Sequence, residues 1–219
     1  LNLTEGKSLY DKKILYSKQG IYDLFVNKED KNRIKREIKS QIEWFIDRLG
    51  FVPSFINGHQ HIQTIPIIAD ILIPILKQYK IDYMRIPHEL EIELELEKGK
   101  VSPELCKVCS TINNNSIEYK KMYQDNGIQT NDYFRGLTFC NRLYTLEDMV
   151  NYIEYLINLD NRNKNKTSEK ICEIMVHPGY IEPENKGWDL FSESKDRETE
   201  LYVLCHKKIK ELNISYLIN

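Results

Sequence analysis

The spacing of apolar positions along the first part of the chain predicts two helices with a strand between them. Over residues 30–50 the apolar side chains recur every three or four positions, which is the period of a helix with one buried face. The short apolar stretch "FVPSFI" at 51–56 is predicted to be a strand. Thr64 and Pro66 then open a second helix with proline in its first turn, and Pro74 is expected to bend or interrupt it.

The rest of the chain continues this alternation of elements. Strands are predicted within "IDYMRIP" (81–87), "DYFRGLTF" (132–139), "ICEIMV" (171–176, expected to be buried) and "ISYLI" (214–218). Helices are predicted within 89–128, where a variable loop accompanies one helix, over 145–159 with Thr145 and Asp148 as its cap, and over 196–212. Strands that alternate with helices predict an α/β fold with parallel strands.

Composition limits the class of protein without changing this picture. The 219 residues are interpreted as a single domain, 1–219, and 41% apolar residues are enough for a buried core. The formal charge of -2, from 31 basic and 33 acidic residues, gives no basic excess for nucleic acid. The most apolar run, 65–81, contains Asp70, Pro74 and Lys77 and is too polar to span a bilayer. We therefore expect neither a nucleic-acid partner nor a membrane segment.

The five cysteines favour a reducing compartment, because an odd, scattered set is not typical of a disulfide framework. The predicted location is therefore the cytoplasm. Cys106 and Cys109 form one CxxC pair, and a structural zinc site needs a second pair of ligands at a suitable spacing. No such spacing is present. A chance pair and a small zinc-stabilised interaction module both remain open.

Two of the five histidines, His59 and His61, lie in "FINGHQHIQTIP" at the end of the strand predicted over 51–56. Residues two apart on a strand face the same side, so both imidazoles are expected to point into one pocket. The carboxyl ends of parallel strands are where α/β enzymes hold their sites, and imidazole is a common ligand of divalent metals. The alternative is a pair of ordinary polar loop residues.

Other candidates also follow predicted strands. His177 ends the strand in "EIMVHPGY", and two strand ends that carry histidines are expected to converge at one face of a barrel. Alternatively, His177 only packs against the Pro-Gly turn. Arg85 and Glu89 in "MRIPHEL" form either a site pair or a surface ion pair.

The order of these segments resembles the YdjC-like carbohydrate deacetylases. "FVPSFINGHQHIQTIP", "IDYMRIPHE" and "EIMVHPGY" follow one another, with "LNLTEGK" at the start and "DLFSESKDRETEL" near the end, so the resemblance covers nearly the whole chain. It implies a divergent (β/α) barrel that removes N-acetyl groups from amino sugars, such as chitin-derived oligosaccharides.

The resemblance also implies roles for individual residues. A divalent cation, magnesium or zinc, is held in the family by one aspartate and two histidines, and His59 matches one of those histidines. His177 matches a histidine that serves as general acid. The side chains expected to contact substrate are His61, Arg85, Glu89 and Tyr180.

The sequence departs from the family pattern at its start. The Asp-Asp pair and the histidine that supply the other metal ligands are not among the 219 residues, and Asn57 stands where the family usually has aspartate. Since Leu1 falls inside a family motif, we expect a barrel that is incomplete at the N-terminus and inactive as it stands. The alternative is a non-catalytic remnant that binds sugar or a protein partner. A homodimer is one of the oligomeric states that the sequence allows.

Overall fold

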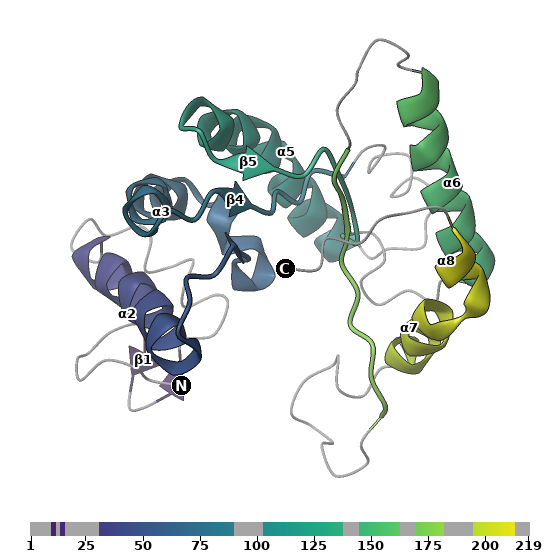
Figure 1. Ribbon diagram of the computed structural model, residues 1–219, viewed down its shortest axis with the longest axis horizontal. Coiled ribbons are helices and arrows are strands. Elements are labelled where there is room, and N and C mark those ends of the chain that lie inside the picture. Colours follow the sequence, from purple (N-terminus) through teal and green to yellow (C-terminus); the bar gives the residue numbers. More distant parts are fainter. Residues whose placement is uncertain are drawn as a thin grey trace. The chain divides into compact units, whose positions relative to one another are not determined.

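The computed structural model spans the 219 residues and describes residues 10–11, 14–15, 31–89, 103–137, 145–162, 170–181 and 195–212 (Figure 1). The chain clusters into two compact units. The first consists of Leu1–His88 and Thr111–Asn131, and the second of Glu89–Ser110 and Asp132–Asn219.

The first unit contains a parallel three-stranded sheet with its helices. The strands are β3 (Phe55–Ile56), β4 (Tyr83–Met84) and β5 (Gln129–Thr130), hydrogen-bonded in that order. The helices are α2 (Lys31–Leu49), the short 3-10 helix η2 (His59–Thr64), α3 (Pro66–Tyr79) and the later part of α5 (Pro103–Asp125). A small antiparallel hairpin joins β1 (Tyr10–Asp11) to β2 (Ile14–Leu15).

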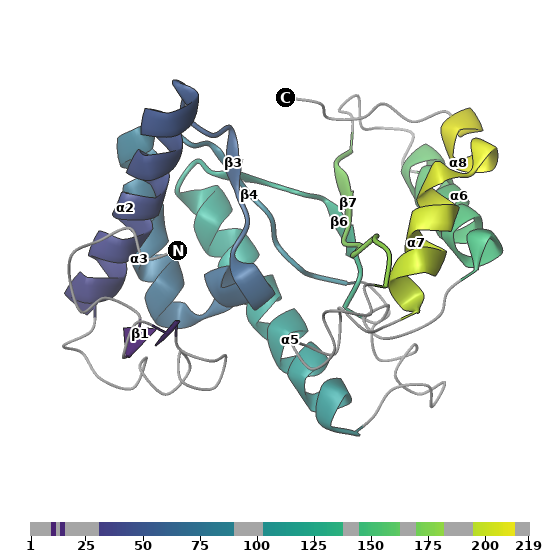
Figure 2. The same cartoon turned by 90° about the horizontal axis from the view of Figure 1, so that it is seen from below.

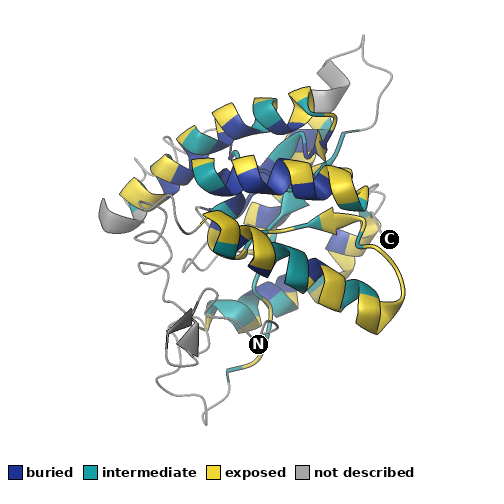
Figure 3. Ribbon diagram, turned by 90° about the vertical axis from the view of Figure 1, so that its left-hand side faces the viewer, coloured by how far each residue is buried: buried dark blue, intermediate teal, exposed yellow. Residues whose placement is uncertain are grey.

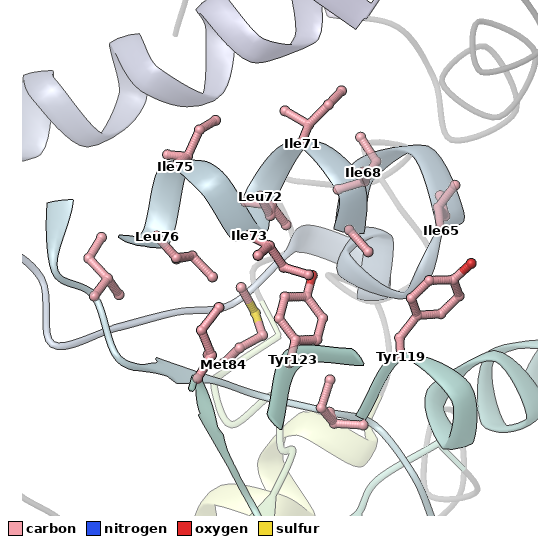
Figure 4. Close-up of a cluster of buried hydrophobic side chains, with 14 of the residues drawn as sticks. Ile65, Ile68, Ile71, Leu72, Ile73, Ile75, Leu76, Met84, Tyr119 and Tyr123 are labelled. Atoms are coloured by element: carbon pink, nitrogen blue, oxygen red, sulfur yellow. The ribbon is translucent and has the colours of Figure 1, made fainter. Parts of the chain in front are cut away.

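The core of this unit is built around α3, the most apolar of its helices. The buried side chains of α3 are Ile68, Ala69, Ile71, Leu72, Ile73, Ile75 and Leu76. Met84 from β4 and the rings of Tyr119 and Tyr123 from α5 face them (Figure 4). Each isoleucine or leucine buried in this way contributes about 1.5–3 kcal/mol. Buried and exposed residues alternate around the helices, as the sequence period requires (Figure 3).

The second unit pairs two parallel strands and packs three further helices. β6 (Tyr133–Arg135) lies beside β7 (Cys172–Ile174). The helices are α6 (Leu146–Arg162), α7 (Asp196–Cys205) and α8 (Lys207–Glu211) (Figure 2). Its smaller core consists of Met149, Ile153, Val203 and Ile209. The predicted capping box is confirmed, since the Asp148 carboxylate accepts hydrogen bonds from the backbone N–H and the hydroxyl of Thr145.

Several details differ from the sequence-based predictions. Helix α3 continues through Pro74, so the helix is not interrupted there, and the expected bend stays a prediction. The predicted helix over 196–212 is two helices, because the backbone of His206 is extended and its imidazole caps α8. Strand β7 is not buried: Cys172 is exposed and the next two residues are half-buried. The strand predicted at 214–218 lies outside the described residues.

The predicted α/β class with parallel strands is confirmed. Over the described ranges the strands do not form a closed barrel, so the divergent barrel stays a prediction, as does the single domain 1–219. Among the helices that the structure describes, every one is too short or too polar to cross a bilayer.

Candidate functional site

His59 and His61 lie in a tight turn rather than on the strand. The turn begins after Gly58, and Gln60 and His61 both adopt the left-handed conformation, with φ of 51° and 64°. His59 is exposed, whereas only 7% of the His61 surface is accessible. The argument for a shared face from strand period is therefore wrong. The placement of both histidines just past the end of a parallel strand is confirmed.

A buried glutamine that the sequence analysis missed braces this turn. The Gln63 amide donates a hydrogen bond of 3.0 Å to the carbonyl of Arg85, and its backbone carbonyl accepts one of 3.0 Å from the hydroxyl of Tyr123. A Cβ atom at Gly58 would lie 2.3 Å from the Gln63 side-chain oxygen, so a larger residue there would force the Gln63 side chain to move. Burial raises the pKa of Tyr123 and keeps its hydroxyl available as a donor.

Arg85 follows β4 and is half-buried. Its neighbour Ile86 is held by the Asn131 side chain, which accepts from the Ile86 N–H at 2.7 Å and donates to its carbonyl at 2.9 Å. This pair of bonds continues the pairing of β4 and β5 beyond their ends and fixes the backbone that presents Arg85. Burial first, and the charge of Lys120 second, lower the pKa of nearby His88 and favour its neutral form.

In the second unit, Glu89 is a fully buried carboxylate rather than part of a surface ion pair. One oxygen lies 2.9 Å from the Arg135 guanidinium, and the other accepts from the N–H groups of Gly136 and Leu137 at 3.1 and 2.8 Å. Arg135 in turn stacks over the ring of Tyr152, 4.9 Å from its centroid. The surface-pair interpretation is wrong for Glu89. Its predicted contact with substrate stays a prediction.

His177 is half-buried and follows β7 by three positions. Its backbone N–H donates to the carboxylate of Glu200 on α7. Glu200 is itself buried, and that burial raises its pKa, while the hydrogen bond from His177 acts in the opposite direction. Tyr180 is 72% exposed, so its ring is open to solvent on this segment.

The described residues give limited support to a metal site. Within these ranges, no three histidine, cysteine, aspartate or glutamate side chains lie close enough together to hold a metal ion. The exposed imidazole of His59 has the donor chemistry of one ligand, but the described residues do not complete a set around it. Buried Cys109 contacts the carbonyl of Leu137 at 3.5 Å, and Cys106 is half-buried, so the CxxC pair does not form a described zinc site either.

The candidates divide between the two units. His59, His61 and Arg85 belong to the first unit, and Glu89, His177 and Tyr180 to the second. Within the first unit, Gln63 connects the histidine turn to the carbonyl of Arg85. The predicted convergence of His59 and His177 on one face stays a prediction.

Residues 1–213 match the model of the family described as YdjC-like protein. The chain belongs to the YdjC-like family. A protein of Danio rerio named carbohydrate deacetylase is 26% identical over 219 residues, covering 91% of this chain and 69% of that protein. Its Xenopus laevis namesake is 28% identical, over 79% of this chain and 58% of its own length. The human carbohydrate deacetylase is 25% identical, over 80% of this chain and 54% of its own length. No solved structure matches this YdjC-like chain significantly.

These coverages show that the chain spans about 54–69% of the length of those three relatives. The family was predicted correctly from the sequence. Gln63, Asn131 and Glu200 were missed, because a polar residue that is buried by tertiary contacts carries no periodic signal in the sequence.

Proposed function

We propose that this protein removes N-acetyl groups from amino sugars or chitin-type oligosaccharides with the help of a divalent cation. The observation that carries the proposal is the family match over 1–213, together with relatives named carbohydrate deacetylase. The position of the histidine turn after a parallel strand supports it. A cytoplasmic location and a homodimer remain predictions from the sequence.

His177 is proposed as the general acid. Amide hydrolysis at neutral pH releases an amine, which leaves readily only if it receives a proton as the C–N bond breaks. An imidazolium at His177 donates that proton and becomes neutral imidazole. The half-buried position of His177 allows it to contact a bound sugar while the backbone holds it in place.

His59 is proposed as a ligand of the cation, since its imidazole is exposed at the end of β3. When bound, such a cation polarises the acetyl carbonyl and lowers the pKa of water. Magnesium and zinc are both retained as candidates.

The remaining residues are proposed to hold the sugar. Arg85 offers a fork of donors for hydroxyl or carboxylate oxygens, and His61 is proposed to contact the sugar from the histidine turn. The exposed ring of Tyr180 stacks on a sugar face. Glu89 has both oxygens engaged by Arg135 and two backbone N–H groups, so its proposed contribution runs through the Gly136–Leu137 backbone.

The test is acetate release from N-acetylated chitooligosaccharides by protein expressed from the complete gene, with magnesium, zinc or a chelator added. His177→Ala should lower kcat about a hundredfold or more while substrate still binds. His59→Ala should abolish stoichiometric metal binding in a calorimetric titration. His206→Asn is the matched control, because it removes an imidazole elsewhere and keeps a capping acceptor for α8.

Three outcomes would contradict the proposal. The first is a wild-type protein that binds the oligosaccharide but releases no acetate with either metal. The second is His177→Ala with near-normal turnover at neutral pH, which removes the general-acid role. The third is unchanged metal affinity in His59→Ala, which removes the ligand role.

A further inference from the structure

The segment that carries His177 is attached to helix α7 by backbone hydrogen bonds at every second residue. The N–H of His177 donates to the Glu200 carboxylate, and that of Gly179 to the carbonyl of Arg197 at 3.2 Å. The N–H of Ile181 donates to the Glu198 carboxylate at 3.3 Å. The side of α7 therefore serves as the hydrogen-bonding partner that a neighbouring strand would otherwise provide.

The bond from His177 differs from the other two in its burial. Glu200 is only 5% exposed, whereas Glu198 is exposed to solvent. A hydrogen bond to a carboxylate is stronger when water does not compete for the oxygen. One turn further along α7, Val203 is buried in the core that also contacts Val176, next to His177. Glu200 is thus fixed by its helix, and it holds the backbone of the candidate acid in turn.

Close contacts restrain the same segment on both sides of His177. Before it, the N–H of Met175 donates to the carbonyl of Arg135 at 2.8 Å, and a Cβ atom on Gly136 would meet the Met175 Cβ at 2.6 Å. After it, a Cβ atom on Gly179 would lie 2.3 Å from the Arg197 guanidinium. The approach at Gly136 needs glycine, because its φ is +143° and the atoms it meets include the Met175 backbone, whereas a larger residue at 179 would displace the flexible Arg197 side chain. The backbone just before His177 therefore has little freedom to shift.

We propose that Glu200 is a positioning residue for His177: its buried carboxylate anchors the His177 backbone on α7 and so sets the direction of the imidazole. Only the catalytic part of this proposal, the role of His177 in the reaction, rests on the proposed function. Glu200 accepts a hydrogen bond from the His177 backbone N–H and is not itself placed against substrate. The anchoring can be measured whether or not the protein is a deacetylase.

The first readout is nuclear magnetic resonance of the complete protein. In Glu200→Ala, the His177 amide should exchange with solvent about tenfold faster or more, because a charge-assisted bond is lost. The imidazole signals of His177 should shift as well. Glu200→Gln should restore both, since the glutamine oxygen still accepts a hydrogen bond. Glu198→Ala is the matched control and should leave the His177 amide and imidazole unchanged, while slow exchange at Ile153 in α6 reports that the fold persists.

The second readout is steady-state acetate release. Glu200→Ala should lower kcat about tenfold to a hundredfold with little change in KM, because a misdirected acid slows the reaction without weakening sugar binding. Glu200→Gln should stay within about threefold of wild type. Unchanged exchange and imidazole signals in Glu200→Ala would overturn the proposal, and so would shifted signals with full activity. Shifted signals in a protein whose wild type releases no acetate would support the anchoring and contradict the proposed function instead.

Discussion

Gly136 shows how strictly the backbone near His177 is determined at the scale of one residue. Its φ of +143° is strained for any other residue, and a Cβ atom would lie 2.9 Å from the Met175 carbonyl oxygen. Gly136→Ala should therefore lower the free energy of unfolding by about 2–4 kcal/mol, the sum of backbone strain and a steric clash. Urea denaturation measures this change.

Gly127 provides the control for that substitution. It also has positive φ, +78°, but a Cβ atom added there would enter open space, with no clashing neighbour within 4 Å. Gly127→Ala should cost only the backbone strain, about 1 kcal/mol. Equal losses for the two variants would show that the contact with Met175 does not constrain Gly136.

Glu200 gives a prediction for the dependence of stability on pH. Burial raises the pKa of Glu200 in the folded protein above the ordinary value of 4.5. At a pH between 4.5 and this raised pKa, the folded protein therefore binds more protons than the unfolded chain. Its contribution to stability is then present below pH 4.5 and is lost as pH rises through the folded pKa. Glu200→Gln does not titrate, so its stability relative to wild type should rise with pH over this interval. Thermal melts of both proteins from pH 4 to pH 8 test the sign, and a melting temperature of Glu200→Gln that falls relative to wild type with rising pH would contradict it.

At the scale of the element, helix α6 depends on an exposed cap that can be tested without disturbing the core. The hydroxyl of Thr145 accepts from the Asp148 N–H at 3.1 Å, and the Asp148 carboxylate accepts from the Thr145 N–H at 2.7 Å. Thr145→Ala should lower the free energy of unfolding by about 1 kcal/mol, whereas Thr145→Ser should stay close to wild type. Circular dichroism melts measure both, and equal melting temperatures for the alanine and serine variants would rule out the cap.

Elements with a clear period were the ones that the sequence predicted well. Helix α2 and strands β3, β4 and β6 fall inside their predicted segments, α3 begins at Pro66 as predicted, and α6 begins as predicted but continues past 159 to Arg162. Each buries one face and therefore repeats apolar residues at a regular spacing. The break at His206 was missed, since apolar residues continue on both sides of it. The left-handed turn at Gln60 and His61 was missed for a related reason: neither residue type signals that conformation as glycine does.

The site was predictable only as far as it depends on strand ends. The segments that follow β3, β4 and β7 could be identified as candidates because α/β proteins place functional groups there. The bracing side chains Gln63 and Glu200 could not, because their partners lie 22 and 23 positions away in the sequence. Long-range contacts between polar groups leave no local pattern.

At the scale of the whole molecule, the prediction of a single domain implies that the two units unfold together in one transition. Residues of both units occur in one continuous helix, α5, which the boundary at Thr111 divides. Destabilising the smaller core should then also lower the stability reported from the other unit. Val203→Ala removes two buried methyl groups and should cost about 2 kcal/mol.

Trp44 on α2 is the reporter for this test, in a Trp188→Phe background that leaves one tryptophan in the chain. If the chain unfolds as one domain, Val203→Ala shifts the urea midpoint that Trp44 fluorescence records. A Trp44 midpoint that is unchanged, alongside a shifted far-ultraviolet transition, would show that the units unfold separately.

The left-handed turn has a consequence for which amino acids positions 60 and 61 accept. Left-handed backbone favours glycine and asparagine and disfavours valine, isoleucine and threonine. In a library randomised at both positions, selection for soluble protein alone should enrich glycine and asparagine at each. Selection on growth with an N-acetylated sugar as the nutrient should return histidine at 61 despite that preference. The difference between the two enrichments at 61 then measures the backbone conformational free energy that histidine costs there relative to glycine or asparagine.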